Sequence, residues 1–416
     1  MARKVLMSNF FYLGIYQGLN FLFPLLISPY LIKTIGLNNF GLITSVQALM
    51  TFFTIFCDYG FNMSATKEIS MNKDHHEIIN NIINSVFIIK IIIVILSSLI
   101  LWILVISIHK FSIYSILYLF SFALPLGRAF FPIWFFQGIQ KMQYLILFSL
   151  FSKGLAAILL ITFIHKPSDS YLVNLFIGFM DFLGTLLMII FVYKIFNFKI
   201  YIPESRHIIQ QTKNGFYLFL ASFFANLTAN SNLVILSFFV KNDALGIFSV
   251  ADRIVFMIKQ LPTIIFQAIY PHACRLWVNS RIKFLIFIKK MFWGIFLLLT
   301  FISIIVSILS KHISLFFSKT NSFEIGSLLS IMCFLPIIAG LNLPAYLGIL
   351  VTEQTRLSSR VIIIAAIINI IFNFIFTSIF GYWGTLLTIA LTDICITVSH
   401  NFIIIFRTKG YNFFKV

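Results

Sequence analysis

The chain has little charge of either sign and is especially poor in acidic residues. Charged residues make up 10% of its 416 positions, with 12 Asp or Glu against 30 Lys or Arg. A soluble protein of this length needs a polar surface, and a hydrophobic content of 60% leaves too little polar material to make one. The composition therefore excludes a soluble globular domain and indicates a polytopic membrane protein.

Cysteine and catalytic motifs are scarce as well. The four cysteines, Cys57, Cys274, Cys333 and Cys395, have no metal-site spacing, and we expect them to pack as small apolar side chains. The sequence contains no Walker motif, no Gly-rich phosphate loop and no nucleophile–base arrangement. We therefore expect no cofactor, no metal and no ATP-driven step on this chain.

Long apolar runs fill most of the sequence. A helix that crosses the hydrocarbon core needs about 20 apolar residues, and continuous apolar runs favour helices over the alternating strands of a barrel. We predict an all-α integral membrane fold with about twelve transmembrane helices. The predicted spans are roughly 10–32, 40–61, 84–108, 112–136, 143–164, 171–194, 216–239, 245–271, 284–309, 325–351, 360–380 and 383–406.

The distribution of Lys and Arg predicts the orientation. Nineteen of the 30 lie in the termini and even-numbered loops, six lie in the opposite loops, and five lie inside predicted spans. The positive-inside rule then places both termini in the cytoplasm. The net charge of +18 is thus mainly a topogenic signal, and we expect no nucleic-acid partner because no basic domain lies outside the membrane.

The two halves of the chain share features at one offset. Gly138 and Gly348 end spans four and ten, 210 residues apart, and Asp181 and Asp393 lie in spans six and twelve, 212 residues apart. This offset predicts a parallel repeat of two pseudo-symmetric six-helix lobes around a central cavity, which is a transporter architecture. The predicted parts are an N-terminal lobe (1–194), a cytoplasmic linker (195–215) and a C-terminal lobe with a short cytoplasmic tail (216–416).

The linker has helix signals of its own. Pro203 and Glu204 are typical of a helix start, apolar residues follow at Ile208 and Ile209, and Gly215 is typical of a stop. We predict a short amphipathic segment on the cytoplasmic face that ends before span seven.

Five cations lie inside predicted spans, where a charge costs roughly 2.5–3.5 kcal/mol on insertion scales. Arg128 lies mid-span between two prolines and is our first choice for binding an anionic group; a structural ion pair is the alternative. Lys153, Arg253 and Lys259 are further candidates for lining a cavity, although Lys153 could snorkel in part. We expect Lys90, about two turns into span three, to snorkel.

Three carboxylates accompany these cations. Asp181 and Asp393 are mid-span, and a carboxylate balanced between desolvation and a nearby cation can exchange protons, as ion coupling requires. The alternative is a permanent ion pair with Arg128 or Arg253. Asp58 lies near the cytoplasmic end of span two, where a helix-end hydrogen bond is an equally good interpretation.

Three blocks of the sequence carry a family resemblance. They are Pro29–Leu31 with Ile35–Leu42, Asp58–Asn62 and Ser64–Glu68; Pro132–Gly138 with Lys141–Met142; and Leu245–Ser249 through Gln267–Pro271. On these blocks the chain resembles the polysaccharide transporters of the multidrug/oligosaccharidyl-lipid/polysaccharide exporter (MOP) superfamily, most closely the Wzx-type O-antigen flippases.

The resemblance implies a flippase of lipopolysaccharide and polysaccharide biosynthesis in the bacterial inner membrane. Its substrate would be an undecaprenyl-pyrophosphate-linked oligosaccharide, carried from the cytoplasmic to the periplasmic leaflet by alternating access. Implied partners are membrane lipids, a coupling ion (proton or sodium), and the polymerase and chain-length regulator of the same pathway. A cationic central cavity would receive the pyrophosphate, and Arg128, Lys153, Arg253 and Lys259 could supply its charge.

Two other classes remain open. A multidrug cation antiporter of the same superfamily would favour carboxylates in its site. Here five basic residues face four acidic ones inside the spans, the fourth being Asp252 beside Arg253. An integral-membrane polysaccharide-processing enzyme is the weaker alternative. A polymerase of that kind would carry a large periplasmic loop, whereas the longest loop here is on the predicted cytoplasmic side.

Overall fold

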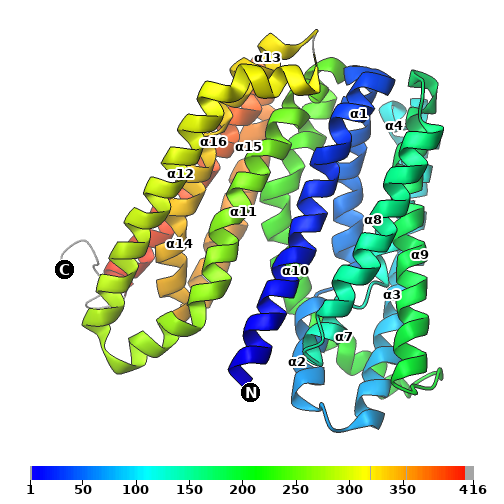
Figure 1. The fold of residues 1–416 in the computed structure, drawn as a ribbon, viewed down its shortest axis with the longest axis vertical. Helices are drawn as coiled ribbons and strands as arrows, with labels where there is room; N and C mark the ends of the chain where they lie inside the picture. Colours follow the sequence, from blue (N-terminus) through cyan, green and yellow to red (C-terminus); the bar gives the residue numbers. More distant parts are fainter. Residues whose placement is uncertain (1, 319, 353, 408–416) are drawn as a thin grey trace. The chain divides into compact units, whose positions relative to one another are not determined.

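The computed structural model describes residues 2–318, 320–352 and 354–407, and within these ranges every regular element is a helix. The chain divides into two compact units, residues 1–226 and 227–416. Unit 1 contains α1 (Ala2–Asp58), α2 (Phe61–Met71), α3 (His76–Ser107), α4 (His109–Ile113), α5 (Ser115–Ser121), α6 (Ala123–Ala129), α7 (Ile133–Gly138), α8 (Gln143–Phe163), the 3₁₀ helix η1 (Pro167–Tyr171), α9 (Leu172–Ile195) and the first part of α10 (Ser205–Phe239). Unit 2 contains the rest of α10, α11 (Asn242–Asn279), α12 (Arg281–Phe317), α13 (Ser322–Met332), α14 (Leu335–Val351), α15 (Thr355–Phe380) and α16 (Tyr382–Arg407) (Figure 1).

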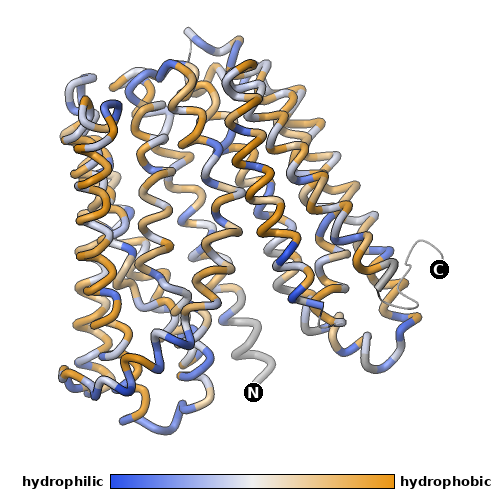
Figure 2. Tube along the Cα trace, turned by 180° about the vertical axis from the view of Figure 1, so that it is seen from behind, coloured by the Kyte–Doolittle hydropathy of each residue, from blue (hydrophilic) through white to orange (hydrophobic). Residues whose placement is uncertain are grey.

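The predicted all-α membrane fold is confirmed. Among the described residues, ten helical segments are long and apolar enough to cross a membrane. One of them, Phe11–Met71, contains the predicted spans 10–32 and 40–61, and the predicted span 245–271 lies in α11, which is outside the ten. Hydrophobic residues follow the helices, while hydrophilic residues gather in the connections (Figure 2). Lipid favours apolar helices, because a helix satisfies its own backbone hydrogen bonds.

Glycine makes the first break between spans. Gly36 has φ 81° and ψ 160°, a backbone conformation outside the helical region, so α1 contains two helices joined at this residue. The left-handed side of φ is open to glycine because it lacks a Cβ. The break falls between the first two predicted spans, as expected.

Proline makes the break that matters most for the site. The predicted span 112–136 is divided into α4 to α7, and α6 ends at Ala129 while α7 begins at Ile133, directly after Pro132. Pro132 has no N–H, and in a continuous helix its ring would clash with the carbonyl group of Arg128, four residues earlier. The helix therefore stops here and leaves Arg128 in the last turn of α6.

The stop expected at Gly215 is wrong. The amphipathic segment after Ser205 and span seven form one continuous helix, α10. Gly215 serves a close contact: a Cβ at this position would lie 2.7 Å from the carbonyl oxygen of Tyr59. The boundary between the two compact units falls inside α10, after Asn226. The predicted lobes and linker (1–194, 195–215 and 216–416) stay a prediction.

Candidate functional site

Glycines bring three helices of unit 1 into close contact. A Cβ at Gly178 of α9 would lie 2.3 Å from the backbone carbon of Ala123 in α6, and a Cβ at Gly184 would lie 2.9 Å from the Cβ of Ser152 in α8. Small residues at such crossings let helix backbones approach closely. The hydroxyl of Thr185 adds a hydrogen bond of 2.7 Å to the carbonyl oxygen of Gly127. As a result, α6 and α8 are both held against α9.

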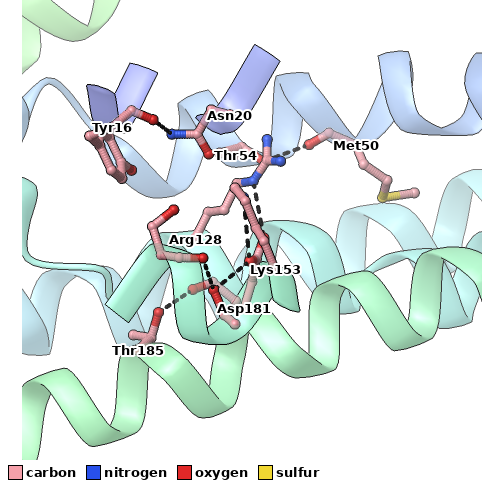
Figure 3. A network of polar contacts seen from close by, with 11 residues as sticks. Tyr16, Asn20, Met50, Thr54, Arg128, Lys153, Asp181 and Thr185 are labelled. Carbon is pink, nitrogen blue, oxygen red and sulfur yellow. Dashed lines mark hydrogen bonds and ion pairs between the residues drawn. The ribbon is translucent and has the colours of Figure 1, made fainter. Parts of the chain in front are cut away.

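This packing brings Arg128, Lys153 and Asp181 together. Oδ2 of Asp181 lies 3.6 Å from Nε of Arg128, and Oδ1 lies 3.9 Å from Nζ of Lys153. The hydroxyl of Ser152 also donates to Oδ1, at 3.3 Å. Figure 3 shows the carboxylate of Asp181 between side chains from α6 and α8. Two cations thus share one carboxylate, and the cluster carries one net positive charge.

The two cations of this cluster differ in exposure. The side chain of Lys153 is 10% exposed and that of Asp181 is 13% exposed, whereas that of Arg128 is 49% exposed. The guanidinium of Arg128 extends from α6 toward α1, where Asn20 and Thr54 lie (Figure 3). A guanidinium carries five N–H donors in a planar fork. Asp181 contacts this guanidinium at Nε. The two terminal nitrogens of Arg128, the most exposed side chain of the cluster, can therefore bind an anionic group.

Lys153 is held inside unit 1. Its ammonium lies 5.5 Å from the centroid of the Phe23 ring, in addition to its pairing with Asp181. Cations are attracted to the faces of aromatic rings. The snorkelling considered for Lys153 is therefore not what the structure shows. The side chain acts as an internal counter-ion for Asp181.

Lys90 was expected to snorkel, and this expectation is wrong. Its side chain is 1% exposed, and Nζ lies 3.6 Å from Oδ1 of Asp58. The ammonium also donates to the carbonyl oxygen of Ala129, at 2.6 Å. Asp58 therefore has a lysine partner on α3.

Unit 2 also contains an intramembrane ion pair. Nζ of Lys259 in α11 donates to Oδ2 of Asp393 in α16 at 2.7 Å, and the two side chains are 22% and 18% exposed. This short contact is a closed pair with no net charge. Arg253 lies six residues earlier on α11 and is partly buried. The shared cavity role predicted for Arg253 and Lys259 stays a prediction.

Sequence reasoning missed several neutral polar contacts. In unit 1 the amide of Gln47 donates to Asn174, which donates to Ser121. In unit 2 the amide of Asn373 donates to Asn232 at 2.7 Å. The signal was present on α15, where buried Asn369, Asn373 and Thr377 follow at intervals of four residues and line one helix face. These contacts join helices where lipid cannot satisfy a polar group.

Comparisons with known proteins place the chain among carbohydrate-related membrane proteins. A family profile described as polysaccharide biosynthesis protein matches residues 6–277. A protein of Escherichia coli (strain K12) named "Putative O-antigen transporter" is 28% identical over 94% of this chain and 95% of its own length. A protein of the same name from Shigella dysenteriae is 23% identical over 94% of this chain and 98% of its own length. These relatives agree with the predicted resemblance and with a transporter in place of an enzyme.

Solved structures share the fold. The lipid II flippase MurJ in an inward closed conformation aligns with a TM-score of 0.70 and 16% identity, covering 95% of this chain and 87% of that chain. An inward-facing multidrug transporter of the MOP superfamily aligns with a TM-score of 0.67 and 13% identity, covering 93% of this chain and 99% of that chain. At these identities the likeness shows the architecture only, and it agrees with the predicted fold class.

Proposed function

Because the chain belongs to the family of polysaccharide biosynthesis proteins, we propose that it is a flippase for lipid-linked oligosaccharides. Its substrate is an undecaprenyl-pyrophosphate-linked repeat unit, which it carries from the cytoplasmic to the periplasmic leaflet of the bacterial inner membrane. The O-antigen transporter names of its relatives support this substrate class. The polymerase and chain-length regulator that act on such repeat units are proposed partners in the same pathway.

The observation that carries the proposal is the net positive cluster of unit 1. A cation inside the membrane costs several kcal/mol unless it is paired, and here two cations share a single carboxylate. Arginine recognises phosphate through two parallel N–H donors, a geometry that lysine does not offer. The half-exposed Arg128 is therefore suited to bind one phosphate of the lipid pyrophosphate, while Lys153 keeps Asp181 neutralised.

Transport then proceeds by rocking of two lobes, as in transporters built from parallel repeats. The headgroup enters from the cytoplasmic leaflet, contacts Arg128, and leaves toward the periplasm, while the lipid tail stays in the bilayer. Asp181, Asp393 and Asp58 are the proposed sites of ion coupling or charge pairing, since each lies next to a lysine that can stabilise its negative charge. The coupling ion is a proton or sodium.

A multidrug cation antiporter is the second candidate, favoured by the fold shared with multidrug transporters of the superfamily. Such a site needs a carboxylate that can receive a cationic drug. Asp58, Asp181 and Asp393 each have a lysine within 4 Å, so their charge is already neutralised. This pairing favours an anionic substrate.

The proposal is tested with full-length protein in liposomes that contain a fluorescent undecaprenyl-pyrophosphate-linked sugar. We expect protein-dependent flipping, and Arg128→Ala should lower its rate about 10- to 100-fold, because a charge-assisted hydrogen bond contributes about 1.5–3 kcal/mol. Arg128→Lys should fall between the two, because it keeps the charge and loses the fork.

Lys194→Ala provides the matched control. Lys194 is an exposed cation in the last turn of α9, and its removal should leave the rate unchanged. The proposal is overturned if wild-type protein moves no lipid-pyrophosphate sugar, or if Arg128→Ala and Lys194→Ala behave alike. Efflux of a cationic dye by the same liposomes would favour the antiporter.

A further inference from the structure

The break after α6 leaves the backbone carbonyl of Ala129 without its helical partner. In a continuous helix, the carbonyl oxygen of Ala129 would accept the N–H of Ile133. Here the N–H of Ile133 bonds instead to the carbonyl oxygen of Phe131, at 2.9 Å, and the N–H of Phe131 bonds to that of Arg128, at 3.2 Å. Ala129 is buried, and a buried carbonyl without a donor is costly.

Lys90 of α3 supplies the missing donor. Its ammonium reaches the carbonyl oxygen of Ala129 at 2.6 Å, and Asp58 of α1 lies on the same ammonium at 3.6 Å. The ring of Phe61 lies 6.0 Å from the ammonium. A side chain that is 1% exposed, at the centre of these three contacts, therefore links α1 and α3 to the end of α6, one residue beyond Arg128.

A carbonyl alone does not require a charged donor. A serine or asparagine could donate at lower desolvation cost, and a buried ion pair stabilises a fold poorly compared with apolar packing. The ion pair fixes the position of the donor. Asp58 pairs with the ammonium of Lys90, and the same ammonium donates to the carbonyl oxygen of Ala129 at the end of α6. The backbone after Arg128 is thereby fixed relative to α1, toward which the guanidinium of Arg128 extends.

We propose that Lys90, held by Asp58, is a positioning residue for Arg128. This role rests on the proposed function: Lys90 fixes the end of α6 so that the guanidinium of Arg128 meets the headgroup phosphate. Lys90 itself does not touch the substrate. Its loss should therefore weaken headgroup binding, even where the protein remains folded.

The same ion pair lies next to a left-handed turn between α1 and α2. Asp58 is followed by Tyr59 and Gly60, whose φ values of 48° and 75° lie in the left-handed region. A Cβ at Gly60 would lie 2.8 Å from the carbonyl oxygen of Gly215, so this corner packs directly on α10 within unit 1. This conformation is strained for a non-glycine residue such as Tyr59, and it persists only where its surroundings hold it. The Asp58–Lys90 pair thus contacts the end of α6 through Ala129, and it directly precedes the turn at Tyr59 and Gly60 that packs on α10.

The test compares Lys90→Met, Asp58→Asn and the double variant in the liposome assay, with substrate concentration varied. Lys90→Met should raise the half-saturating substrate concentration about tenfold or more, with a smaller change in the maximal rate. The double variant removes both charges, so it should regain the thermal stability lost in either single variant. It should keep the raised half-saturating concentration, because the carbonyl of Ala129 still lacks its donor. Lys194→Met is the matched control and should change neither quantity.

A second readout does not depend on transport. With the four native cysteines replaced by alanine, a spin label attached at Arg128→Cys should show increased mobility when Lys90→Met is added, and no change when Lys194→Met is added. The inference is overturned if the double variant recovers stability and half-saturation together, which would indicate a structural role only. It is also overturned if the label is unaffected by Lys90→Met. Wild-type protein that moves no substrate would refute the proposed function, while the label would still decide the role of Lys90.

Discussion

Replacing Asp181 by Asn should destabilise the protein chiefly through Lys153. The side chain of Lys153 is 10% exposed, and its partner is the carboxylate of Asp181 at 3.9 Å. Removing one member of a buried pair costs about 3–5 kcal/mol, because the other charge is left uncompensated. Arg128 is 49% exposed, and an exposed pair contributes only about 0–1 kcal/mol. Nearly all of the loss should therefore come from the stranded lysine.

A double-mutant cycle measures this difference. We expect Asp181→Asn to lower the free energy of unfolding by about 3 kcal/mol, and the addition of Lys153→Met to recover most of the loss. The cycle between Asp181 and Arg128→Met should give a coupling below about 1 kcal/mol. Steric-trap unfolding in bicelles gives these free energies for the full-length chain. The reasoning is refuted if the two cycles give equal couplings, or if Asp181→Asn with Lys153→Met is less stable than Asp181→Asn alone.

Two further predictions follow from the packing and from unit 2. Gly184→Ala should lower the free energy of unfolding by about 1–3 kcal/mol, since its Cβ would lie 2.9 Å from that of Ser152. Adding Ser152→Gly should restore part of this loss, and no recovery in the same unfolding assay would contradict the contact. Lys259→Met should lower thermal stability by stranding Asp393, and Lys259→Met with Asp393→Asn should restore it, because the 2.7 Å pair is neutral as a unit. A melting curve of each variant in detergent checks this, and equal melting temperatures for the single and double variants would count against the closed pair.

The sequence located the intramembrane charges, but it could not assign all their partners. Asp181 and Asp393 each pair with a cation on another helix. The partners depend on which helices meet, and that was decided by contacts such as Gly178 against the backbone of Ala123. Helix periodicity within a span does not carry this information.

Two errors have specific physical causes. Snorkelling of Lys90 was inferred from a span starting near residue 84, but α3 begins at His76, which places Lys90 about 21 Å along the helix at ~1.5 Å per residue. The stop at Gly215 was inferred from glycine as a helix terminator. This glycine is used for its small size, where α10 packs on the carbonyl of Tyr59. In both cases tertiary packing overrode a local signal.

The intramembrane charge clusters differ in net charge, and the cluster around Asp181 in unit 1 is positive. Lys90 with Asp58 and Lys259 with Asp393 are pairs without net charge, so neither has an excess positive charge that would attract an anion. Arg128 and Lys153 share Asp181 and retain one positive charge, which the membrane environment makes costly until an anion arrives. Under the proposed function, an anionic headgroup gains more by entering unit 1 at Arg128 than by breaking either neutral pair. The net charge beside Arg128 is then the charge that the proposed pyrophosphate substrate neutralises.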